Sequence, residues 1–356
     1  MNSVVIVTGA AGLVGSACVR RFCGAGLHVV GIDNNMRGKM FGPDASTEGM
    51  LSSLSSEFPK RFTGVEGDVR DGELASRIIV EQQRTGKLIG VVHAAAQPSH
   101  DYAVVNPLLD FSINAEATLT WLRAVQEHAH DTVFIQVSTN KVYGDLVNRR
   151  AGLVEHKSRY SSPTFPCGID ESFSIDQSKH SLFGVSKLYG DLVAQEYGRY
   201  LDVPTVIFRC GCITGASHAG VEAHGFLSYL VKCAISDAPY TVYGYQGKQV
   251  RDQLHAEDLA DAFLLVINDP PPPGTVYNMG GGVQCNCSVL EAMSVCAQKT
   301  GRPFTPSQFK PGRAGDHMWW ISDTRKFEGD YPHWVPKWDL PGMVGDIIEA
   351  NTARKP

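Results

Sequence analysis

Short apolar runs alternate with amphipathic stretches along the first part of the chain. The apolar runs predict strands, and segments whose apolar residues recur every three or four positions predict helices. The predicted strands cover residues 4–8, 28–32, 61–67, 88–93 and 132–137, and the predicted helices cover 13–22, 72–84 and 107–127. This alternation requires right-handed crossovers and a parallel sheet covered on both faces. The sequence therefore predicts an α/β fold with a doubly wound parallel sheet.

The second half of the chain continues the pattern less regularly. Its predicted elements are a helix over 182–200, a strand over 203–209, a helix over 258–266, a strand over 276–278 and a helix over 289–299. Residues 211–250 are richer in polar and turn-forming residues. Residues 145–181 have few periodic apolar positions, and a loop of this length inside a compact domain is usually functional or disordered. We expect it to cover a substrate.

Composition excludes several classes of partner. The chain has 356 residues and a net charge of −5 with scattered basic residues, so we expect no nucleic-acid partner. No apolar run reaches membrane-spanning length and the start lacks a signal-peptide pattern, so we expect a cytoplasmic protein with no membrane partner. The nine cysteines show no disulfide framework. The pairs at 210/212 and 285/287 are better interpreted as reduced thiols than as metal ligands, so we expect no metal.

A glycine-rich turn follows the first predicted strand. Gly9, Gly12 and Gly15 separate that strand from an amphipathic helix, a spacing that lets a helix N-terminus approach a pyrophosphate. The alternative is a purely structural turn. Asp33 ends the second predicted strand, where a carboxylate would accept hydrogen bonds from a ribose 2′-OH. Together these features predict a dinucleotide site in a Rossmann-type sheet, and Asp33 favours NAD over NADP.

Longer motifs point to a family. They are the glycine turn with Asp33, Asp68-Val69, Asn114, the Ser-Thr-Asn-Lys-Val-Tyr-Gly-Asp run over 138–145, the Gln-Val-Arg-Asp segment with His255 and Asp258, and Gly312-Arg313 with Asp316. With these motifs the chain resembles, essentially end to end, the extended short-chain dehydrogenase/reductase family of NDP-sugar epimerases and dehydratases. The resemblance implies bound NAD and a nucleotide-diphosphate sugar as the substrate.

The resemblance also implies roles for individual residues. Contacts with NAD are expected from Gly9, Ala11, Gly12, Leu13, Val14, Asp33, Asn34, Asp68, Val69, Ala94, Ala95, Ala96, Asn114, Ser138 and Lys187. For Asp68, which would bind the adenine amino group, a helix N-cap at Asp68 or Asp71 is the alternative. Contacts with the substrate are expected from Gln97, Thr139, Asn140, Lys141, Arg251, Arg313 and Asp316. The two arginines would hold the diphosphate and Asp316 a ribose hydroxyl.

The catalytic positions depart from the family pattern. The family places Tyr-x-x-x-Lys where this chain has Phe183 and Lys187, so the phenol that normally takes the sugar hydroxyl proton is missing. Thr139 matches the family's second catalytic hydroxyl. A substitute acid or base is expected from Thr139, Asp101 or Tyr102, with His100, Cys210 and Cys212 as further candidates, or from water. Where 4,6-dehydratases of the family carry an acidic pair, this chain has Asn140 and Lys141, which argues against that dehydration.

These observations leave three functions open. The leading interpretation is an NAD-dependent nucleotide-sugar epimerase that works through a transient keto-sugar. The alternatives are other NAD-assisted sugar chemistry (a dehydratase, 4-epimerase or decarboxylase) and a non-catalytic nucleotide-sugar or NAD-binding protein. We expect an NAD-binding domain over 1–210 with 254–280, and a smaller nucleotide-sugar-binding lobe over 211–253 and 281–356.

The family also pairs two long helices of each subunit, which implies a homodimer. The predicted helices over 107–127 and 182–200 carry apolar residues beyond a single stripe. We expect Trp121, Leu188 and Tyr189 to lie on an exposed apolar patch there, because such patches mark interfaces.

Overall fold

A computed structural model shows how these elements are arranged, and it describes residues 3–218, 220–222, 225–312 and 315–353. The chain forms two compact units. The first comprises residues 1–139, 182–209 and 259–277, and the second comprises 140–181, 210–258 and 278–356. Within the described residues, no helix is both long enough and apolar enough to span a membrane.

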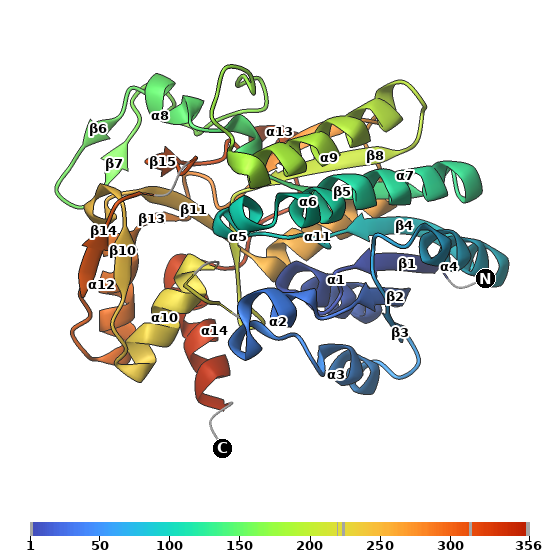
Figure 1. The fold of residues 1–356 in the computed structure, drawn as a ribbon, viewed down its shortest axis with the longest axis horizontal. Coiled ribbons are helices and arrows are strands. Elements are labelled where there is room, and N and C mark those ends of the chain that lie inside the picture. The colour runs from blue at the N-terminus through green and yellow to red at the C-terminus, as the bar shows by residue number, and fades with distance from the viewer. Residues whose placement is uncertain (1–2, 219, 223–224, 313–314, 354–356) are drawn as a thin grey trace. The chain divides into compact units, whose positions relative to one another are not determined.

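The first unit is built on a seven-stranded sheet in the order β12-β8-β5-β4-β1-β2-β3 (Figure 1). The pairings between neighbours from β3 to β5 are parallel. The chain runs outward from β1 to β3 and then returns to β4 on the other side of β1, so the strand order reverses between β1 and β4. In such sheets ligands bind beyond the carboxyl ends of the strands at this reversal. The strands are β1 (Ser3–Thr8), β2 (His28–Asp33), β3 (Phe62–Glu66), β4 (Lys87–His93), β5 (Val133–Thr139), β8 (Thr205–Cys210) and β12 (Thr275–Met279).

Helices connect these strands, and the predicted doubly wound α/β class is confirmed. They are α1 (Leu13–Gly24), α2 (Met36–Phe41), α3 (Met50–Glu57), α4 (Gly72–Thr85), α5 (His100–Val105), α6 (Pro107–Phe111), α7 (Ala117–His128), α9 (Ser181–Arg199) and α11 (Ala256–Asn268), with a short 3₁₀ turn η1 (Pro43–Ala45). The predicted helix over 107–127 contains a π-helical turn, η2 (Ser112–Glu116), between α6 and α7. Helix α5 was not predicted, because a six-residue helix has too few apolar positions to show a period.

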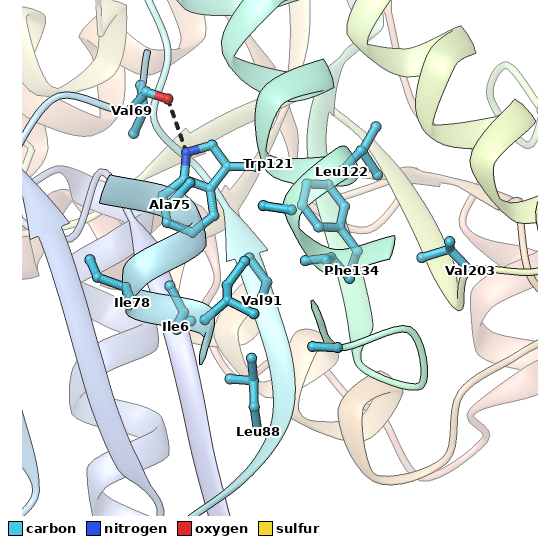
Figure 2. Packing of buried hydrophobic residues seen from close by; sticks show 14 of the residues in the cluster. Ile6, Val69, Ala75, Ile78, Leu88, Val91, Trp121, Leu122, Phe134 and Val203 are labelled. Carbon is cyan, nitrogen blue, oxygen red and sulfur yellow. Dashed lines mark hydrogen bonds between the residues drawn. The ribbon is translucent and has the colours of Figure 1, made fainter. Parts of the chain in front are cut away.

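The core of the first unit contains a residue that the sequence led us to place on the surface. Trp121 on α7 is fully buried, and its indole Nε1 donates to the Val69 carbonyl at 3.0 Å (Figure 2). It packs among side chains such as Ala75, Val91 and Phe134. The expectation that Trp121 belongs to an exposed patch is therefore wrong: it faces α4 and the sheet, where its one polar group finds a backbone acceptor.

Helix α9 runs alongside the α6–α7 segment (Figure 1). Gly190 makes this approach possible, because a Cβ there would lie 2.9 Å from the Asn114 carbonyl oxygen. The rings of Phe111 and Tyr189 also meet, with centroids 5.8 Å apart. The two segments are thus packed closely at one small residue, which positions the polar side chains that each carries.

The second unit contains a small sheet in which β13, β11 and β15 are neighbours and β9 also pairs with β11. Helices α10, α12 and α14 bury a separate apolar cluster. The 211–250 segment is more regular than its polar composition predicted, because α10 lies within it. The elements are η3 (Asn140–Tyr143), α8 (Leu146–Arg150), β6 (Val154–Glu155), β7 (Tyr160–Ser161), β9 (Cys212–Thr214), α10 (Phe226–Ser236), β10 (Thr241–Tyr243), η4 (Tyr245–Gly247), β11 (Val250–His255), β13 (Asn286–Ser288), α12 (Val289–Thr300), β14 (Gln308–Lys310), β15 (Trp319–Trp320), α13 (Arg325–Asp330) and α14 (Leu340–Ala353).

Candidate functional site

The glycine turn after β1 has the geometry of a phosphate cradle. Gly9 has a φ of +68°, and its amide donates to the Ile32 carbonyl at 2.8 Å. A Cβ at Gly9 would lie 2.8 Å from the Ala95 backbone, and one at Gly15 would lie 2.1 Å from the Gly9 oxygen. Gly12 is the N-cap of α1 and makes no side-chain cap bond. The backbone around Gly9 and Gly15 is thus packed so tightly that only glycine fits, and α1 begins directly after Gly12, the arrangement in which a helix N-terminus can bind a pyrophosphate.

Asp33 closes this turn at the end of β2. Its carboxylate accepts hydrogen bonds from the amides of Ala11 at 3.0 Å and Asn35 at 2.9 Å. Burial raises the pKa of Asp33, and these backbone donors oppose that rise. The carboxylate is therefore anchored beside the glycine turn, which suits a dinucleotide ribose.

Asp68 lies beyond the end of β3 and is engaged with its neighbours. Its side chain accepts from Asn34 Nδ2 at 3.0 Å and pairs with Arg70 at 2.6 Å. The hydrogen bond from Arg70 is the main reason that the pKa of Asp68 is lowered. The helix N-cap in this segment is Asp71, whose side chain accepts from two amides at the start of α4. Asp68 is therefore not the cap of α4; its carboxylate is held beside Asn34 by the hydrogen bond from Asn34 Nδ2.

A buried polar network follows β4. The loop that begins with Ala94, Ala95 and Ala96 continues to Gln97, whose side-chain amide donates to Asp110 Oδ1 at 2.6 Å. Asn114 Nδ2 lies 3.0 Å from the same carboxylate oxygen and 3.1 Å from Ser186 Oγ on α9. Burial raises the pKa of Asp110, and hydrogen bonds from its neighbours oppose the rise. The expected substrate residue Gln97 and the expected cofactor residue Asn114 thus both have their side chains in this network.

Lys187 is buried on α9, one helical turn from Phe183. Its Nζ donates to the Val137 carbonyl at 2.6 Å, which places the ammonium at the end of β5. Its charge also helps to lower the pKa of His93, which burial brings to about 3. Ser138 lies next to Val137 and donates to Asp191 at 2.6 Å. The expected cofactor residues Ser138 on β5 and Lys187 on α9 are therefore close in space, and Thr139 follows Ser138 at the end of β5.

Phe183 stands where the family resemblance leads us to expect a tyrosine, and an imidazole lies against its ring. The ring centroids of His100 and Phe183 are 5.0 Å apart with an interplanar angle of 66°. The neighbouring candidates lie differently: Asp101 is exposed, and the ring of Tyr102 packs edge-on against Phe41 at 5.8 Å. The structure therefore brings His100 onto the ring at position 183, whereas the ring of Tyr102 packs on Phe41.

The second unit contains a cluster of Lys141, Arg251 and Asp316, which we call the Asp316 cluster. Lys141 Nζ lies 3.0 Å and Arg251 Nη2 lies 2.6 Å from Asp316 Oδ1. Burial would raise the pKa of Asp316, but the cations of Arg251 and Lys141 hold it well below the usual range. Burial lowers the pKa of Lys141 and Asp316 opposes this shift. The expected substrate residues Lys141, Arg251 and Asp316 thus form one cluster, with Asn140 adjacent in η3.

The other expected residues contribute less to a site. Arg313, expected at the diphosphate, lies outside the described residues. Burial raises the pKa of the Cys212 thiol to about 11, so this thiol is a poor base near neutral pH. In the part of the chain that the structure describes, no three histidine, cysteine or acidic side chains come together to hold a metal ion.

Sequence reasoning missed the residues that support this site. Asp110 and Ser186 are buried in the network around Asn114, and Asp191 forms a buried ion pair with Arg209 at 2.8 Å while accepting from Ser138. A usable signal was present, because Asp110 and Asn114 are polar residues four positions apart in a segment with apolar helical spacing. A buried polar pair of this kind requires partners inside the fold.

Comparison with known proteins identifies the family. The model of the NAD dependent epimerase/dehydratase family matches residues 5–280, so the chain belongs to this family. The expected family and the expected cofactor, NAD, are confirmed.

Individual relatives span nearly the whole chain. CDP-paratose 2-epimerase from Salmonella typhi is 29% identical, and the match covers 94% of each chain. dTDP-glucose 4,6-dehydratase from Escherichia coli is 26% identical, with 94% of this chain and 89% of the relative covered. The crystal structure of UDP-glucose 4-epimerase from Bifidobacterium longum, in complex with NAD+ and UDP, has a TM-score of 0.79 at 24% identity, covering 99% of this chain and 98% of the other.

Proposed function

We propose that the protein is a nucleotide-sugar epimerase that uses NAD and works through a transient keto-sugar with a non-standard acid/base. The observation that carries this proposal is the chemical nature of the two side chains that follow Thr139 in the sequence, Asn140 and Lys141. Lys141 stands there as an ammonium paired with Asp316, and Asn140 is an amide. By the family resemblance, elimination of water from the sugar uses an acidic pair at the positions of Asn140 and Lys141. Neither of these two side chains is a carboxyl group. Epimerisation needs no such pair.

The chemistry that NAD would supply when bound is reversible acceptance of a hydride from the sugar carbon. The residues that would hold the cofactor are those of the glycine turn, Asp33 and Lys187. Lys187 already has its ammonium fixed at the Val137 carbonyl, so it would donate to a nicotinamide ribose without a large loss of side-chain entropy. The buried network around Asn114 would keep α9 and the loop after β4 in place around the reacting groups.

The Asp316 cluster would hold the nucleotide-diphosphate part of the substrate. It contains two cations and one carboxylate, so it carries an excess positive charge in a partly buried place. The planar guanidinium of Arg251 matches phosphate oxygens, and Asp316 orients it. We assign Arg313 to the same diphosphate on the family resemblance alone.

The test is a screen of CDP-, UDP-, GDP- and dTDP-sugars. A ligand at about 100 times its dissociation constant stabilises the folded protein by about 2.7 kcal/mol, which shifts the thermal unfolding midpoint measurably. NMR analysis of the products should then show an epimer of a sugar that protects. Formation of an unsaturated or 6-deoxy-keto product would instead show that a dehydratase is the right alternative.

Phe183 specifically favours one other candidate, a binding protein that has lost turnover. In that case a nucleotide sugar would protect against unfolding, but no product and no spectral change of bound NAD would appear. Gain of epimerase activity only in Phe183→Tyr would support this candidate over the epimerase.

We also propose that two copies associate through the exposed apolar side of α6 and α9. The side chains that form this apolar face are Leu108, Phe111, Leu182, Val185, Tyr189 and Leu192, all exposed in one chain. The contact between Phe111 and Tyr189 joins the two helices into one continuous surface. Apolar surfaces of this kind are typical of interfaces.

A further inference from the structure

We infer that His100 is the group that exchanges the proton of the sugar hydroxyl, in place of the phenol missing at position 183. The inference rests on the proposed epimerase function and adds to it the identity of the acid/base. Imidazole is the side chain best suited to general acid–base work near neutral pH.

The geometry places this imidazole where the proton must be handled. His100 is half-buried at the first position of α5, just beyond the carboxyl end of β4. Its ring packs against Phe183 with the centroids 5.0 Å apart. Phe183 occupies the position of the family's catalytic tyrosine, one helical turn before Lys187. The imidazole is therefore held beside the ring that carries the acid/base oxygen in other family members.

The position of His100 is fixed from both sides. Ser99 caps α5 by accepting from the Tyr102 amide at 3.2 Å, and Gln97 Nε2 donates to the Ser99 carbonyl at 2.9 Å. Gln97 also belongs to the network that reaches Ser186 through Asn114. Ser186 Oγ in turn donates to the Phe183 carbonyl at 3.0 Å. A chain of buried hydrogen bonds thus connects the residue before His100 to Phe183, which makes the ring contact a defined feature of the fold.

The other candidates are less suited to the role. Asp101 is exposed, and the ring of Tyr102 packs on Phe41. Thr139 has an aliphatic hydroxyl, which is a much weaker base than imidazole near neutral pH. His100 has both a ring that packs against Phe183 and an imidazole nitrogen that can exchange a proton.

The proposed step is balanced in atoms and electrons. The O–H bond of the sugar hydroxyl breaks and its proton forms an N–H bond with His100. The C–H bond of the same carbon breaks, and its hydrogen leaves with both electrons to the oxidised nicotinamide. The sugar becomes a ketone and His100 an imidazolium. On return of the hydride to the other face, the imidazolium gives its proton back to the alkoxide oxygen.

Four variants test this assignment. His100→Phe keeps an aromatic ring against Phe183 but removes the proton-exchanging nitrogen, and His100→Gln is a second variant in case the larger ring disturbs folding. The double variant His100→Phe/Phe183→Tyr restores an oxygen beside Lys187. His333→Phe is the matched control, because His333 is exposed. Turnover is measured on the sugar nucleotide that the natural protein epimerises, and NAD binding is measured separately from the shift in the unfolding midpoint.

We expect turnover of the His100 variants to fall about 10²- to 10⁴-fold, the usual contribution of a positioned acid/base. The NAD-dependent shift should stay unchanged, and the double variant should recover at least about tenfold. A readout independent of activity is the imidazole C–H NMR signal of His100, which is identified in the natural protein as the signal that is missing from His100→Phe. Adding the sugar nucleotide should move this signal, whereas the signal assigned through His333→Phe should stay in place.

Three results would overturn the inference. If the natural protein turns over and both His100 variants do so within about threefold of it, the assignment is wrong while the epimerase function stands. Loss of the NAD-dependent shift in both variants would show a structural role instead. If the natural protein epimerises none of the CDP-, UDP-, GDP- and dTDP-sugars, the proposed function fails and the assignment fails with it.

Discussion

Lys187 is a buried cation whose ammonium donates a short hydrogen bond to the Val137 carbonyl. We predict that Lys187→Ala weakens NAD binding by about ten- to a hundredfold, because a hydrogen bond from a charged group contributes about 1.5–3 kcal/mol. Isothermal titration of NAD into the two proteins measures the change. Lys299→Ala on the exposed end of α12 is the control. Equal affinity in Lys187→Ala and the natural protein would contradict the role of Lys187.

Asp33 leads to a second prediction, on the choice of dinucleotide. Its carboxylate is held by the amides of Ala11 and Asn35, so it would accept from a ribose 2′-OH and repel a 2′-phosphate. A cation near Asp33 could reverse this preference by pairing with a 2′-phosphate, and Arg37 is such a residue; its guanidinium lies over the Phe41 ring at 5.6 Å. We expect NAD to bind at least about tenfold more tightly than NADP to the natural protein. In Asp33→Ala, the ratio of the NADP dissociation constant to the NAD dissociation constant should be smaller. Titration of NAD and NADP into the natural protein, Asp33→Ala and the control Glu48→Ala measures these affinities. Equal affinities of the natural protein for NAD and NADP would refute the prediction.

At the scale of helices, two glycines in different surroundings allow a matched comparison. A Cβ at Gly190 on α9 would lie 2.9 Å from the Asn114 carbonyl oxygen, whereas one at Gly345 on α14 would meet nothing within 4 Å. We predict that Gly190→Ala destabilises the protein by about 1–3 kcal/mol through overpacking, and that Gly345→Ala stabilises it by about 0.5–1 kcal/mol. Urea unfolding of the two variants measures both effects. A Gly190→Ala protein as stable as Gly345→Ala would show that α9 can move away without cost.

Strand β11 carries a buried carboxyl group that should make stability depend on pH. Asp252 Oδ2 accepts from the Ser322 amide at 2.9 Å and the Gly282 amide at 3.4 Å, while no partner of Oδ1 is found among the described residues. Burial raises the pKa of Asp252 from 3.8 to about 6. Between these values the folded protein binds more protons than the unfolded chain, so stability falls as the pH rises.

We predict that ionisation of this group lowers the free energy of unfolding by about 3 kcal/mol over its whole titration, of which about 2 kcal/mol falls between about pH 4 and pH 6, since one pKa unit corresponds to about 1.4 kcal/mol. Asp252→Asn cannot ionise and should lose this dependence. The measurement is urea unfolding of both proteins across the pH range, taking the difference between them at each pH so that other groups cancel. Parallel stability curves would show that Asp252 stays protonated or is solvated.

For the whole molecule, the apolar face of α6 and α9 predicts a homodimer. Light scattering at micromolar concentration should give the mass of two chains. Val185 on this face is 51% exposed, and Val80 on α4 is 47% exposed away from it. We expect Val185→Asp to shift the mass to one chain and Val80→Asp to leave it unchanged, because burying an unpaired carboxylate in an interface is costly. A monomeric natural protein would contradict the proposed assembly.

The sequence alone was sufficient for the fold class and for the glycine turn between β1 and α1. Both depend on local rules: apolar runs and helical periods define strands and helices, and Gly9, Gly12 and Gly15 are needed wherever backbone must approach backbone closely. Local rules failed where an element was short or its composition was mixed. Helix α5 and helix α10 were missed for this reason, and Trp121 was misplaced because a helical wheel does not say which apolar stripe faces the sheet.

Only the tertiary structure decided which polar residues meet. Asp110, Asn114 and Ser186 come together across two segments separated by more than 60 positions, and sequence spacing cannot show such a network. The same holds for Lys141 and Asp316, which are 175 positions apart. The family resemblance leads us to expect a tyrosine at position 183, and only the fold shows that His100 packs against the Phe183 ring found there. The physical reason is that long-range contacts depend on how whole elements pack, and local spacing does not determine that packing.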